Sequence, residues 1–402
     1  MTAATPSHQH GHAMPSTCNA PDSPNEMPVS PHLPRVISRD RIPMRYPGLD
    51  LLRLLAVLMV LGRHFHFPDA NFSPLLYLWY QGGWVGVDLF FVLSGFLVSG
   101  LLFREHLKFG KIDFRRFLIR RGLKIYPAFW VMLLSTIVFR LLRTVPIEPR
   151  YLFGELLFLQ NYLGGLWNYT WSLAVEEHFY LGIAVLFIAL LRKNRLDPFA
   201  SIPTIFLILC VACLIFRILT VRHIPEYQGK WYTFATHNRI DSLFFGVLIS
   251  YLWHYKTLRS RLQRIPPFVL LIAGLALLSP AFLVDLQTHK WVSAAGVILF
   301  YLGSGLLVLA AVTAKFHPSR VLACSGTLGA ASYSIYLWHG PVNEFCKSIL
   351  SNATGPSYWL AYLPGYLGGS LFFGLLMSKL IEWPVLKVRD KFFPSESNSV
   401  SP

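Results

Sequence analysis

Apolar runs recur along almost the whole chain, each about as long as a membrane-spanning helix and separated from the next by a short polar segment. A bilayer core requires roughly 20 apolar residues in an α-helix. We therefore expect an all-α protein, a polytopic bundle of transmembrane helices with about ten spans. The expected spans are 49–67, 84–103, 122–143, 171–191, 199–219, 239–254, 267–285, 291–313, 327–350 and 358–383.

The two ends of the chain lack this pattern. Residues 1–45 are rich in Pro, Ser, His and Asn and have no hydrophobic periodicity, which predicts a disordered tail. This tail has no apolar core and therefore does not resemble a signal peptide. We divide the chain into a cytoplasmic tail over 1–45, a transmembrane domain over 46–390 and a short cytoplasmic tail over 391–402, which is too short for a further domain.

Composition and charge agree with a membrane protein. Apolar residues make up 54% of the chain and charged residues 14%, whereas a soluble protein carries about 25% charged residues. The net charge of +16 does not indicate nucleic acid here, because most Lys and Arg lie in short loops. Well over half of the 36 Lys and Arg lie on the side of the N-terminal tail. The positive-inside rule then predicts cytoplasmic termini and a multi-pass protein of the plasma (inner) membrane.

The first span, GLDLLRLLAVLMVLGRHFHF over 48–67, carries unusual polarity. At ~100° per residue, Arg53 and His64 share one helix face about 16 Å apart, with Asp50 close to the same stripe. Arg63 and His66 fall outside the stripe, near the outer boundary. A charge inside a span costs about 2.5–3.5 kcal/mol and usually faces the bundle interior. The simpler alternatives are an Asp50–Arg53 ion pair and a histidine bonded to a neighbouring carbonyl.

Ionisable residues recur in at least six spans and predict a polar cavity across the bilayer. Two classes of protein fit such a cavity: a transporter or proton relay, and an enzyme that passes a group from a cytoplasmic donor to an outer acceptor. His339 is expected between mid-membrane and the outer half. The inner half is expected to hold Arg53, Arg121, Lys124 and Glu382, and the outer half His64, Asp88, Glu176, Glu177, Arg239 and Asp241.

Local patterns give three finer expectations. Adjacent helical positions point ~100° apart, so we expect Glu176 to face the cavity and Glu177 to bond a neighbour. The Gly-Pro pair at 340–341 is expected to break the ninth helix. Glycines at 82, 83 and 86 are expected to let another backbone approach closely.

Aromatic residues in the outer loops have two interpretations. They can stack on a sugar ring, or they can belong to the aromatic belt at the membrane interface, which we favour. These residues are Trp167, Tyr169, Trp231 and Tyr232.

Seven segments together resemble the acyltransferase-3 family of integral membrane acyltransferases, in that family's order and over about 45–390. The family's Arg-x10-His signature appears as Arg53 and His64. Lys124 stands where the family more often has Arg, which keeps the charge but not a bidentate grip on phosphate, and His178 replaces the commoner Gln. The segments are GLDLLRLLAVLMVLGRHF, GGWVGVDLFFVLSGFL, RRGLKIYP, TWSLAVEEHFYL, RIDSLFFG, SYSIYLWHGPV and IEWP.

The resemblance implies an O-acetyltransferase that moves an acyl group, usually acetyl, from acetyl-CoA to a hydroxyl of a carbohydrate or glycan. It implies no tightly bound cofactor or metal. Acyl transfer to a lipid or secondary metabolite, and a transporter of glycan or organic anion without chemistry, are the alternatives.

The resemblance also suggests roles for individual residues. A neutral His64 would act as general base, and either direct transfer or an acyl-histidine intermediate is compatible with the sequence. The expected catalytic residues are His64, Arg53, Glu176 and Asp88; the expected CoA-binding residues are Arg53, Arg121 and Lys124; the expected substrate-binding residues are Glu177, Arg239, Asp241 and His339.

Overall fold

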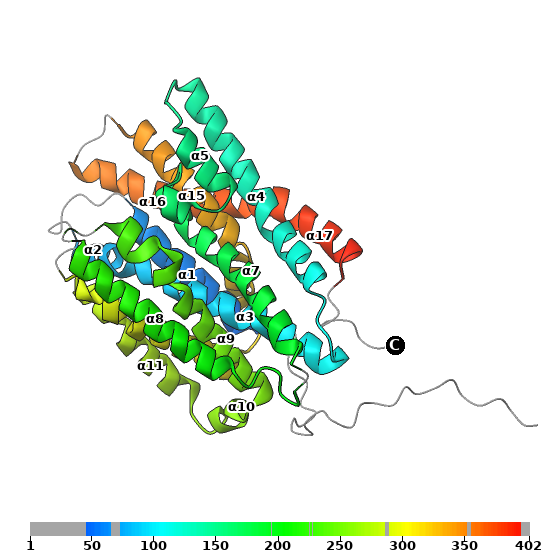
Figure 1. The fold of residues 1–402 in the computed structure, drawn as a ribbon. Coiled ribbons are helices and arrows are strands. Elements are labelled where there is room, and N and C mark those ends of the chain that lie inside the picture. The colour runs from blue at the N-terminus through cyan, green and yellow to red at the C-terminus, as the bar shows by residue number, and fades with distance from the viewer. Residues whose placement is uncertain are drawn as a thin grey trace, which may run out of the picture. The chain divides into compact units, whose positions relative to one another are not determined.

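The computed structural model describes most of the region expected to be transmembrane. All regular elements in these residues are helical (Figure 1). The expected tail over 1–45, residue His66 and the end of the chain beyond 394 lie outside the described residues. The described residues are 46–65, 73–193, 195–224, 226, 228–285, 289–351 and 355–394, without the side chains of 355–357.

A helix occupies each of the ten apolar segments. Six helical segments among the described residues are long and apolar enough to cross a membrane. Others fall short by length or charge, since α9 has 16 residues and α11 has 12. The helices are α1 (Pro47–His64), α3 (Gly86–Phe109), α4 (Phe114–Leu142), α7 (Trp171–Leu191), α8 (Ile202–His223), α9 (Ile240–Tyr255), α11 (Pro267–Leu278), α13 (Val297–Thr313), α15 (Ser332–Ile349) and α16 (Gly355–Met377).

Shorter helices connect or extend these segments, and most of them lie outside the expected spans. Proline at the first helical position begins α2 and α5, where its missing N–H costs no hydrogen bond. Ser319 caps α14 by accepting a hydrogen bond from the Leu322 N–H at 3.1 Å. These helices are α2 (Pro74–Gly82), α5 (Pro149–Leu156), α6 (Gln160–Leu163), α10 (Leu258–Leu262), α12 (Pro280–Leu283), α14 (Arg320–Ala330) and α17 (Trp383–Phe392).

Single turns of tighter or wider helix complete the description. The 3-10 turns are η1 (Gly83–Val85), η2 (Asn168–Thr170) and η4 (Thr236–Asn238), and the π-helical turns are η3 (Lys230–Phe234), η5 (Val292–Gly296) and η6 (Ser378–Glu382).

Helix α1 lies among α3, α13, α14 and α15, so its polar residues face other helices (Figure 1). Small residues permit this packing. A Cβ at Gly83 would lie 2.2 Å from the Met59 carbonyl oxygen, and one at Gly86 would lie 2.5 Å from that of Ala56. These contacts confirm the expected close approach of another backbone at Gly83 and Gly86, whereas a Cβ at Gly82 would meet the side chain of Phe282.

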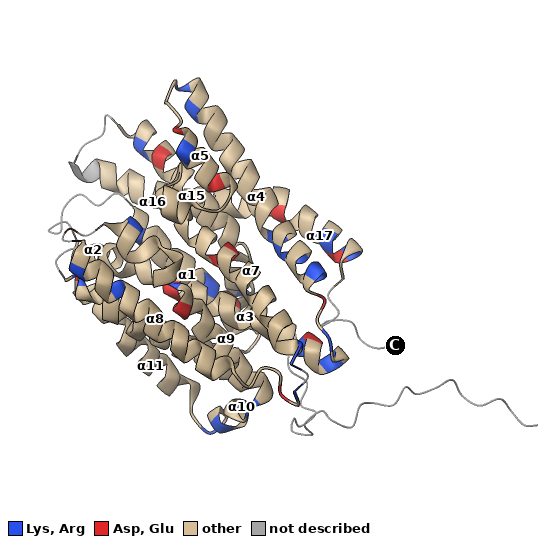
Figure 2. Cartoon of the chain, in the orientation of Figure 1, with Lys and Arg blue, Asp and Glu red and all other residues tan. Residues whose placement is uncertain are grey.

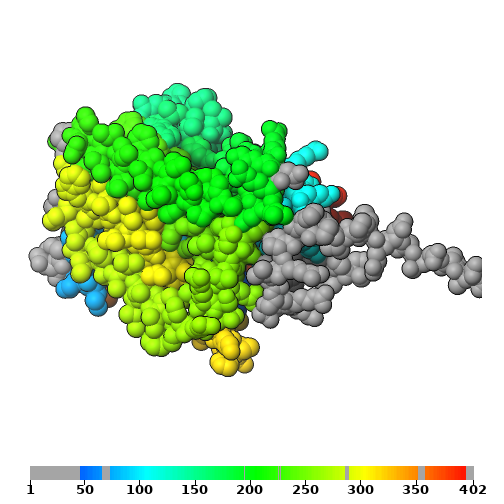
Figure 3. Space-filling model, turned by 60° about the horizontal axis from the view of Figure 1, so that its bottom comes forward, coloured from blue at the N-terminus to red at the C-terminus, as the bar shows by residue number. Residues whose placement is uncertain are grey.

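The surface of the bundle is apolar over long stretches. On α8, Leu207 and Ile208 are 60% and 62% exposed. Phe268 and Ile272 on α11 are exposed in the same way. Figure 2 shows α8 and α11 almost without charged residues along most of their length, and Figure 3 shows the face to which both contribute. Such a surface suits lipid tails and fits a multi-pass membrane protein.

The expected break at Gly340-Pro341 is wrong, because α15 continues through both residues. Proline has no N–H for the carbonyl four residues earlier, which is that of Leu337. The hydroxyl of Tyr169 donates a hydrogen bond to this carbonyl at 2.7 Å. A residue from another segment, just before α7, thus replaces the missing backbone partner, and α15 stays helical.

Candidate active site

Two histidines from distant parts of the chain meet where α1 ends. The ring centroids of His64 on α1 and His339 on α15 are 5.0 Å apart. Tyr169, just before α7, packs on both rings, with centroids 4.3 Å from His339 and 5.9 Å from His64. Sequence reasoning selected both histidines but did not predict that they touch.

Backbone carbonyls fix the orientation of both rings. His64 Nδ1 lies 2.9 Å from the Val60 oxygen, and His339 Nδ1 lies 2.5 Å from the Tyr336 oxygen. A carbonyl only accepts hydrogen bonds, so Nδ1 carries the proton and Nε2 of a neutral ring keeps its lone pair. Nε2 of His339 is buried without a hydrogen-bond partner in the described part of the chain. Each ring of the pair in its neutral form therefore keeps a basic Nε2.

The end of α1 is held by side chains from α15 and α16. The last carbonyls of a helix have no partner within it. Asn343 Nδ2 donates to the His64 carbonyl at 2.6 Å, and the Tyr366 hydroxyl donates to that of Leu61 at 3.1 Å. The Tyr362 hydroxyl donates in turn to Asn343 Oδ1 at 2.6 Å. These positioning residues lie outside the motifs that the sequence analysis used.

Two of the outer aromatics are buried, so their interpretation as interfacial belt residues is wrong. Tyr169 is 5% exposed and Tyr232 is 2% exposed. Tyr232 donates through its hydroxyl to the Ile224 carbonyl. Both rings have partners inside the fold, and only Trp231 of the four is exposed.

Glu155 on α5 anchors the loop that carries Tyr169. Its carboxylate is fully buried and accepts hydrogen bonds from the Thr170 hydroxyl at 2.9 Å and the Trp167 N–H at 3.4 Å. Burial, only partly offset by these hydrogen bonds, raises the pKa of Glu155 to about 7.

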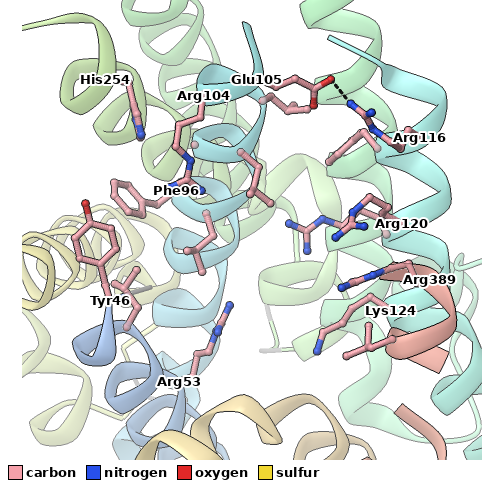
Figure 4. Close-up of a pocket in the computed structure, with 18 of the residues that line it drawn as sticks. Tyr46, Arg53, Phe96, Arg104, Glu105, Arg116, Arg120, Lys124, His254 and Arg389 are labelled. Carbon is pink, nitrogen blue, oxygen red and sulfur yellow. Dashed lines mark hydrogen bonds and ion pairs between the residues drawn. The ribbon is translucent and has the colours of Figure 1, made fainter. Parts of the chain in front are cut away.

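A basic cavity of about 390 Å³ lies at the opposite end of α1 (Figure 4). Residues of α1, α3, α4, α9 and α17 line it. We call it the basic cavity because seven Arg and Lys side chains line it against two carboxylates, Asp50 and Glu105. The seven are Arg53, Arg104, Arg116, Arg120, Arg121, Lys124 and Arg389.

The three residues expected to bind CoA all line this cavity but differ in their partners. Arg53 forms an ion pair with Asp50 at 3.0 Å, which was the simpler expectation for this pair. Lys124 forms an ion pair with the buried Glu382. Arg121 forms no hydrogen bond or ion pair with the described residues, and its guanidinium lies over the Tyr180 ring at 5.3 Å. Arg121 is therefore the most available of the three for an anion.

A second, smaller cavity of about 130 Å³, which we call the narrow cavity, shares three lining residues with the basic cavity. Arg53, Arg121 and Lys124 line both cavities. The narrow cavity also reaches Ser172 and Tyr336, whose hydroxyl oxygens are 2.7 Å apart. The Tyr336 ring is 5.7 Å from that of His339, measured between centroids. Adjacent side chains thus connect the anion-attracting end of the site to the histidine end.

The two adjacent glutamates of α7 point in different directions, as their helical spacing predicts. Glu176 lines the narrow cavity and accepts hydrogen bonds from Ser94 at 3.2 Å and Tyr180 at 2.5 Å. Glu177 accepts from the Tyr126 hydroxyl at 2.9 Å. Neither carboxylate bonds to His64, whose Nδ1 is already engaged by Val60.

Asp88, Arg239 and Asp241 form a buried ion-pair cluster with Arg217 instead of lining either cavity. Arg239 pairs with Asp88 at 2.8 Å and Arg217 with Asp241 at 2.9 Å, and all four side chains are at most 1% exposed. The sequence analysis expected catalytic or substrate-binding roles for three of these residues and gave no role to Arg217. Their ionic partners explain the difference, since each charge is matched inside the bundle.

Comparison with known proteins identifies related sequences. A family model for an acyltransferase domain matches residues 46–378. A peptidoglycan O-acetyltransferase, OatA, of Listeria monocytogenes is 27% identical over 370 residues, which are 85% of this chain and 56% of that protein. The O-acetyltransferase OatA of Staphylococcus aureus is 27% identical over 377 residues, 87% of this chain and 59% of that protein.

The chain thus spans less than two thirds of the length of these relatives. The comparison with solved structures found no match. The family model covers most of the chain, including Arg53, His64 and His339. The chain belongs to the acyltransferase-3 family.

Proposed function

We propose that this protein transfers an acyl group, with acetyl as the expected group, from acyl-CoA to a hydroxyl of a carbohydrate or glycan. The relative from Listeria monocytogenes is named for peptidoglycan, which supports a glycan acceptor. The proposal includes ten spans in the plasma membrane, cytoplasmic termini and no tightly bound cofactor. The concentration of Lys and Arg in loops on one side supports this orientation.

The observation that carries the proposal is the spatial order of two cavities and the histidine pair along α1. A basic cavity, a narrow cavity and a histidine pair follow one another, and Arg53 and His64 stand about 16 Å apart on the same helix. A donor with anionic phosphates and a long neutral arm fits this order. The phosphates would lie among the arginines, and the arm would carry the thioester past Tyr336 to the histidines.

An arginine side chain without an ionic partner among the described residues supports binding of the donor. A guanidinium without an ionic partner can bind phosphate through two parallel hydrogen bonds. Arg121 meets this condition at the junction of the two cavities. Arg53 and Lys124 keep carboxylate partners and would add charge around the junction.

The geometry of His64 supports general-base catalysis. Nε2 would take the proton of the acceptor hydroxyl while that oxygen attacks the thioester carbonyl. The C–S bond then breaks, the new ester forms, and the thiolate of CoA takes the proton from His64. His339 would orient the acceptor hydroxyl from the facing position. Glu176 would act from the narrow cavity on the arm of the donor.

Isotope transfer in membranes tests the proposal. Membranes that contain the protein would be incubated with acetyl-labelled acetyl-CoA and soluble peptidoglycan fragments, beside membranes without it. We expect label on the fragments in an alkali-labile ester. Unlabelled glycan, lipid and protein together with intact acetyl-CoA would contradict the proposal.

The same assay separates the alternatives. A transporter of glycan or organic anion would move its cargo without any covalent label. An enzyme acting on a lipid or secondary metabolite would place the label in the organic extract instead of on the glycan.

A further inference from the structure

The basic cavity has two unlike walls (Figure 4). On the wall formed by α4 and α17, every basic side chain that lines the cavity except Arg121 already has an ionic partner among the described residues. Arg116 pairs with Glu105 at 2.7 Å, and Arg120 and Arg389 both pair with Asp390, at 3.0 and 2.8 Å. Lys124 on the same wall pairs with Glu382. Much of this wall's charge is therefore matched by carboxylates of the protein.

The opposite wall carries aromatic rings and one available cation. Tyr46 precedes α1, Phe96 lies on α3, and Trp253 lies on α9. Arg104 on α3 lies beside Phe96 in Figure 4, and its side chain forms no hydrogen bond or ion pair with the described residues. This wall thus offers flat apolar surface beside a guanidinium that is free to bind an anion.

His254 on α9 adds a hydrogen-bond acceptor to this wall. Its side chain is 4% exposed, yet it lines the cavity and points toward it in Figure 4. Its Nδ1 lies 2.8 Å from the Ser250 carbonyl oxygen, so Nδ1 donates and Nε2 of the neutral ring accepts. Nε2 has no hydrogen-bond partner in the described part of the chain. Buried polar atoms are rarely left unpaired, so this nitrogen indicates a missing donor.

Gly100 makes room for this ring. A Cβ at Gly100 would lie 3.3 Å from His254 Cε1 and 3.9 Å from Nε2. The edge of the imidazole that carries the unpaired nitrogen therefore faces a position without a side chain. Gly100 and His254 both line the cavity, so this edge of the ring lies at the cavity wall.

We propose that this wall binds the nucleotide end of the donor, with an adenine ring against the aromatic side chains and a phosphomonoester on Arg104. The amino group of adenine is a hydrogen-bond donor and matches Nε2 of His254. Aromatic side chains stack on bases through their π-faces, and an unpaired arginine binds phosphate through two hydrogen bonds. The proposal rests on the proposed acyl-CoA function and adds the orientation of the donor.

This orientation explains how the donor fills both cavities. The nucleotide lies on the wall formed by the start of α1, α3 and α9. The pantetheine arm then passes Arg53 and Arg121 into the narrow cavity, which both residues line. The paired arginines of the opposite wall contribute a positive field without a direct hydrogen bond to the nucleotide.

Binding measurements on the purified protein in nanodiscs test the phosphate contact. The probes are CoA and 3′-dephospho-CoA. We expect the wild type to bind CoA about tenfold more tightly, because a charge-assisted hydrogen-bond pair is lost with the phosphate. Arg104→Gln should lose this preference and bind both probes alike. Arg192→Gln, an exposed arginine at the end of α7, should keep it.

A CoA analogue with hypoxanthine in place of adenine tests the base contact. It replaces the amino group by a carbonyl, so the wild type should bind it several-fold more weakly than CoA. His254→Ala should bind both alike. Equal binding of the two probes by the wild type would overturn the assignment, and this comparison needs no variant. A folded Arg104→Gln or His254→Ala protein that keeps the wild-type preference for CoA would overturn it as well.

Failure of the proposed function gives a different result. In that case the wild type neither binds CoA nor transfers label from acetyl-CoA. Tight binding of CoA and normal transfer, together with indifference to the 3′-phosphate and the amino group, would overturn only the nucleotide site.

Discussion

Two regions of the molecule concentrate charge inside an otherwise apolar bundle, and they differ in what surrounds it. In the basic cavity, Arg104 and Arg121 have no ionic partner among the described residues and adjoin an open volume of about 390 Å³. In the buried ion-pair cluster, Arg239 and Arg217 each meet an aspartate within 3 Å and are 1% exposed. From the sequence alone the two regions look alike, because both consist of arginines and carboxylates in or next to the expected spans.

The difference indicates which charged residues inside the bundle bind a ligand and which stabilise the fold. A buried arginine with an aspartate partner fixes helices to one another. Arg239 is further enclosed by the rings of Phe91 and Trp171, 5.6 and 5.8 Å from its guanidinium carbon. An arginine without a carboxylate and with space beside it is set up for a ligand. We therefore infer a structural role for Asp88, Arg239 and Asp241, and a binding role for Arg104 and Arg121.

The largest expected effect falls on the histidine pair. His64→Ala should lower acyl transfer by about 10²–10⁴-fold, because the general base is removed. Steady-state rates with labelled acetyl-CoA measure this loss. His223→Ala is the matched control, since His223 also ends its helix with Nδ1 2.9 Å from the carbonyl four residues earlier, but is exposed. A normal rate in correctly inserted His64→Ala protein would exclude His64 as the base.

Breaking the buried ion-pair cluster should cost stability. Arg239→Met leaves Asp88 buried without its cation, which costs about 3–5 kcal/mol of unfolding free energy. Thermal unfolding in detergent should show a large fall in Tm. Arg222→Met, at the end of α8 and outside the cluster, should leave Tm almost unchanged. A similar Tm for Arg239→Met and wild type would contradict the distinction between the two regions.

Glu155 extends the comparison to a buried carboxylate without an ionic partner in the described residues. Its folded-state pKa of about 7 exceeds the ordinary value of 4.5. The folded state therefore binds the proton more tightly, and stability is lost as pH rises through the folded pKa. We expect the unfolding free energy to fall by about 2 kcal/mol between roughly pH 5.5 and 8 from this group.

Glu155→Gln should remove that part of the pH dependence, while Glu148→Gln, at an exposed position of the same loop, should keep it. Tm measured across this pH range in the three proteins decides the matter. A slope that survives Glu155→Gln would assign the pH dependence to another group.

Arg121 gives the smallest expected effect and the most specific one. Arg121→Gln should raise KM for acetyl-CoA about tenfold with little change in kcat or Tm, because a phosphate contact is lost. Arg143→Gln is the matched control: Arg143 follows the same helix and lies over the Phe139 ring at 5.4 Å, but it is exposed. An effect on Tm without an effect on KM would make Arg121 structural.

Much of the helical layout could be predicted because hydrophobic pattern and helical geometry are local. The apolar runs located the long helices, and a 100° rotation per residue predicted that Glu176 and Glu177 point in different directions. The short helices α5 and α6 were not predicted because segments of 8 and 4 residues are too short to show a reliable periodicity.

The composition of the site depended on contacts that no local pattern encodes. His64 and His339 are far apart in sequence, and only the packing of α15 against α1 joins them. Arg217 lies in an otherwise apolar helix, where nothing nearby in sequence shows its partner Asp241. The helix through Pro341 persists because Tyr169 supplies a hydrogen bond from another segment. Each of these features required the tertiary structure.

The kinetics of a double variant, Asp88→Leu with Arg239→Met, test the distinction between the two regions most directly. Replacing both partners of a buried ion pair by apolar side chains of similar size is often neutral for stability. We predict that the double variant folds and that its kcat and KM for acetyl-CoA stay within about threefold of wild type. A folded double variant without acyl transfer would contradict the assignment and place these charges in the chemistry.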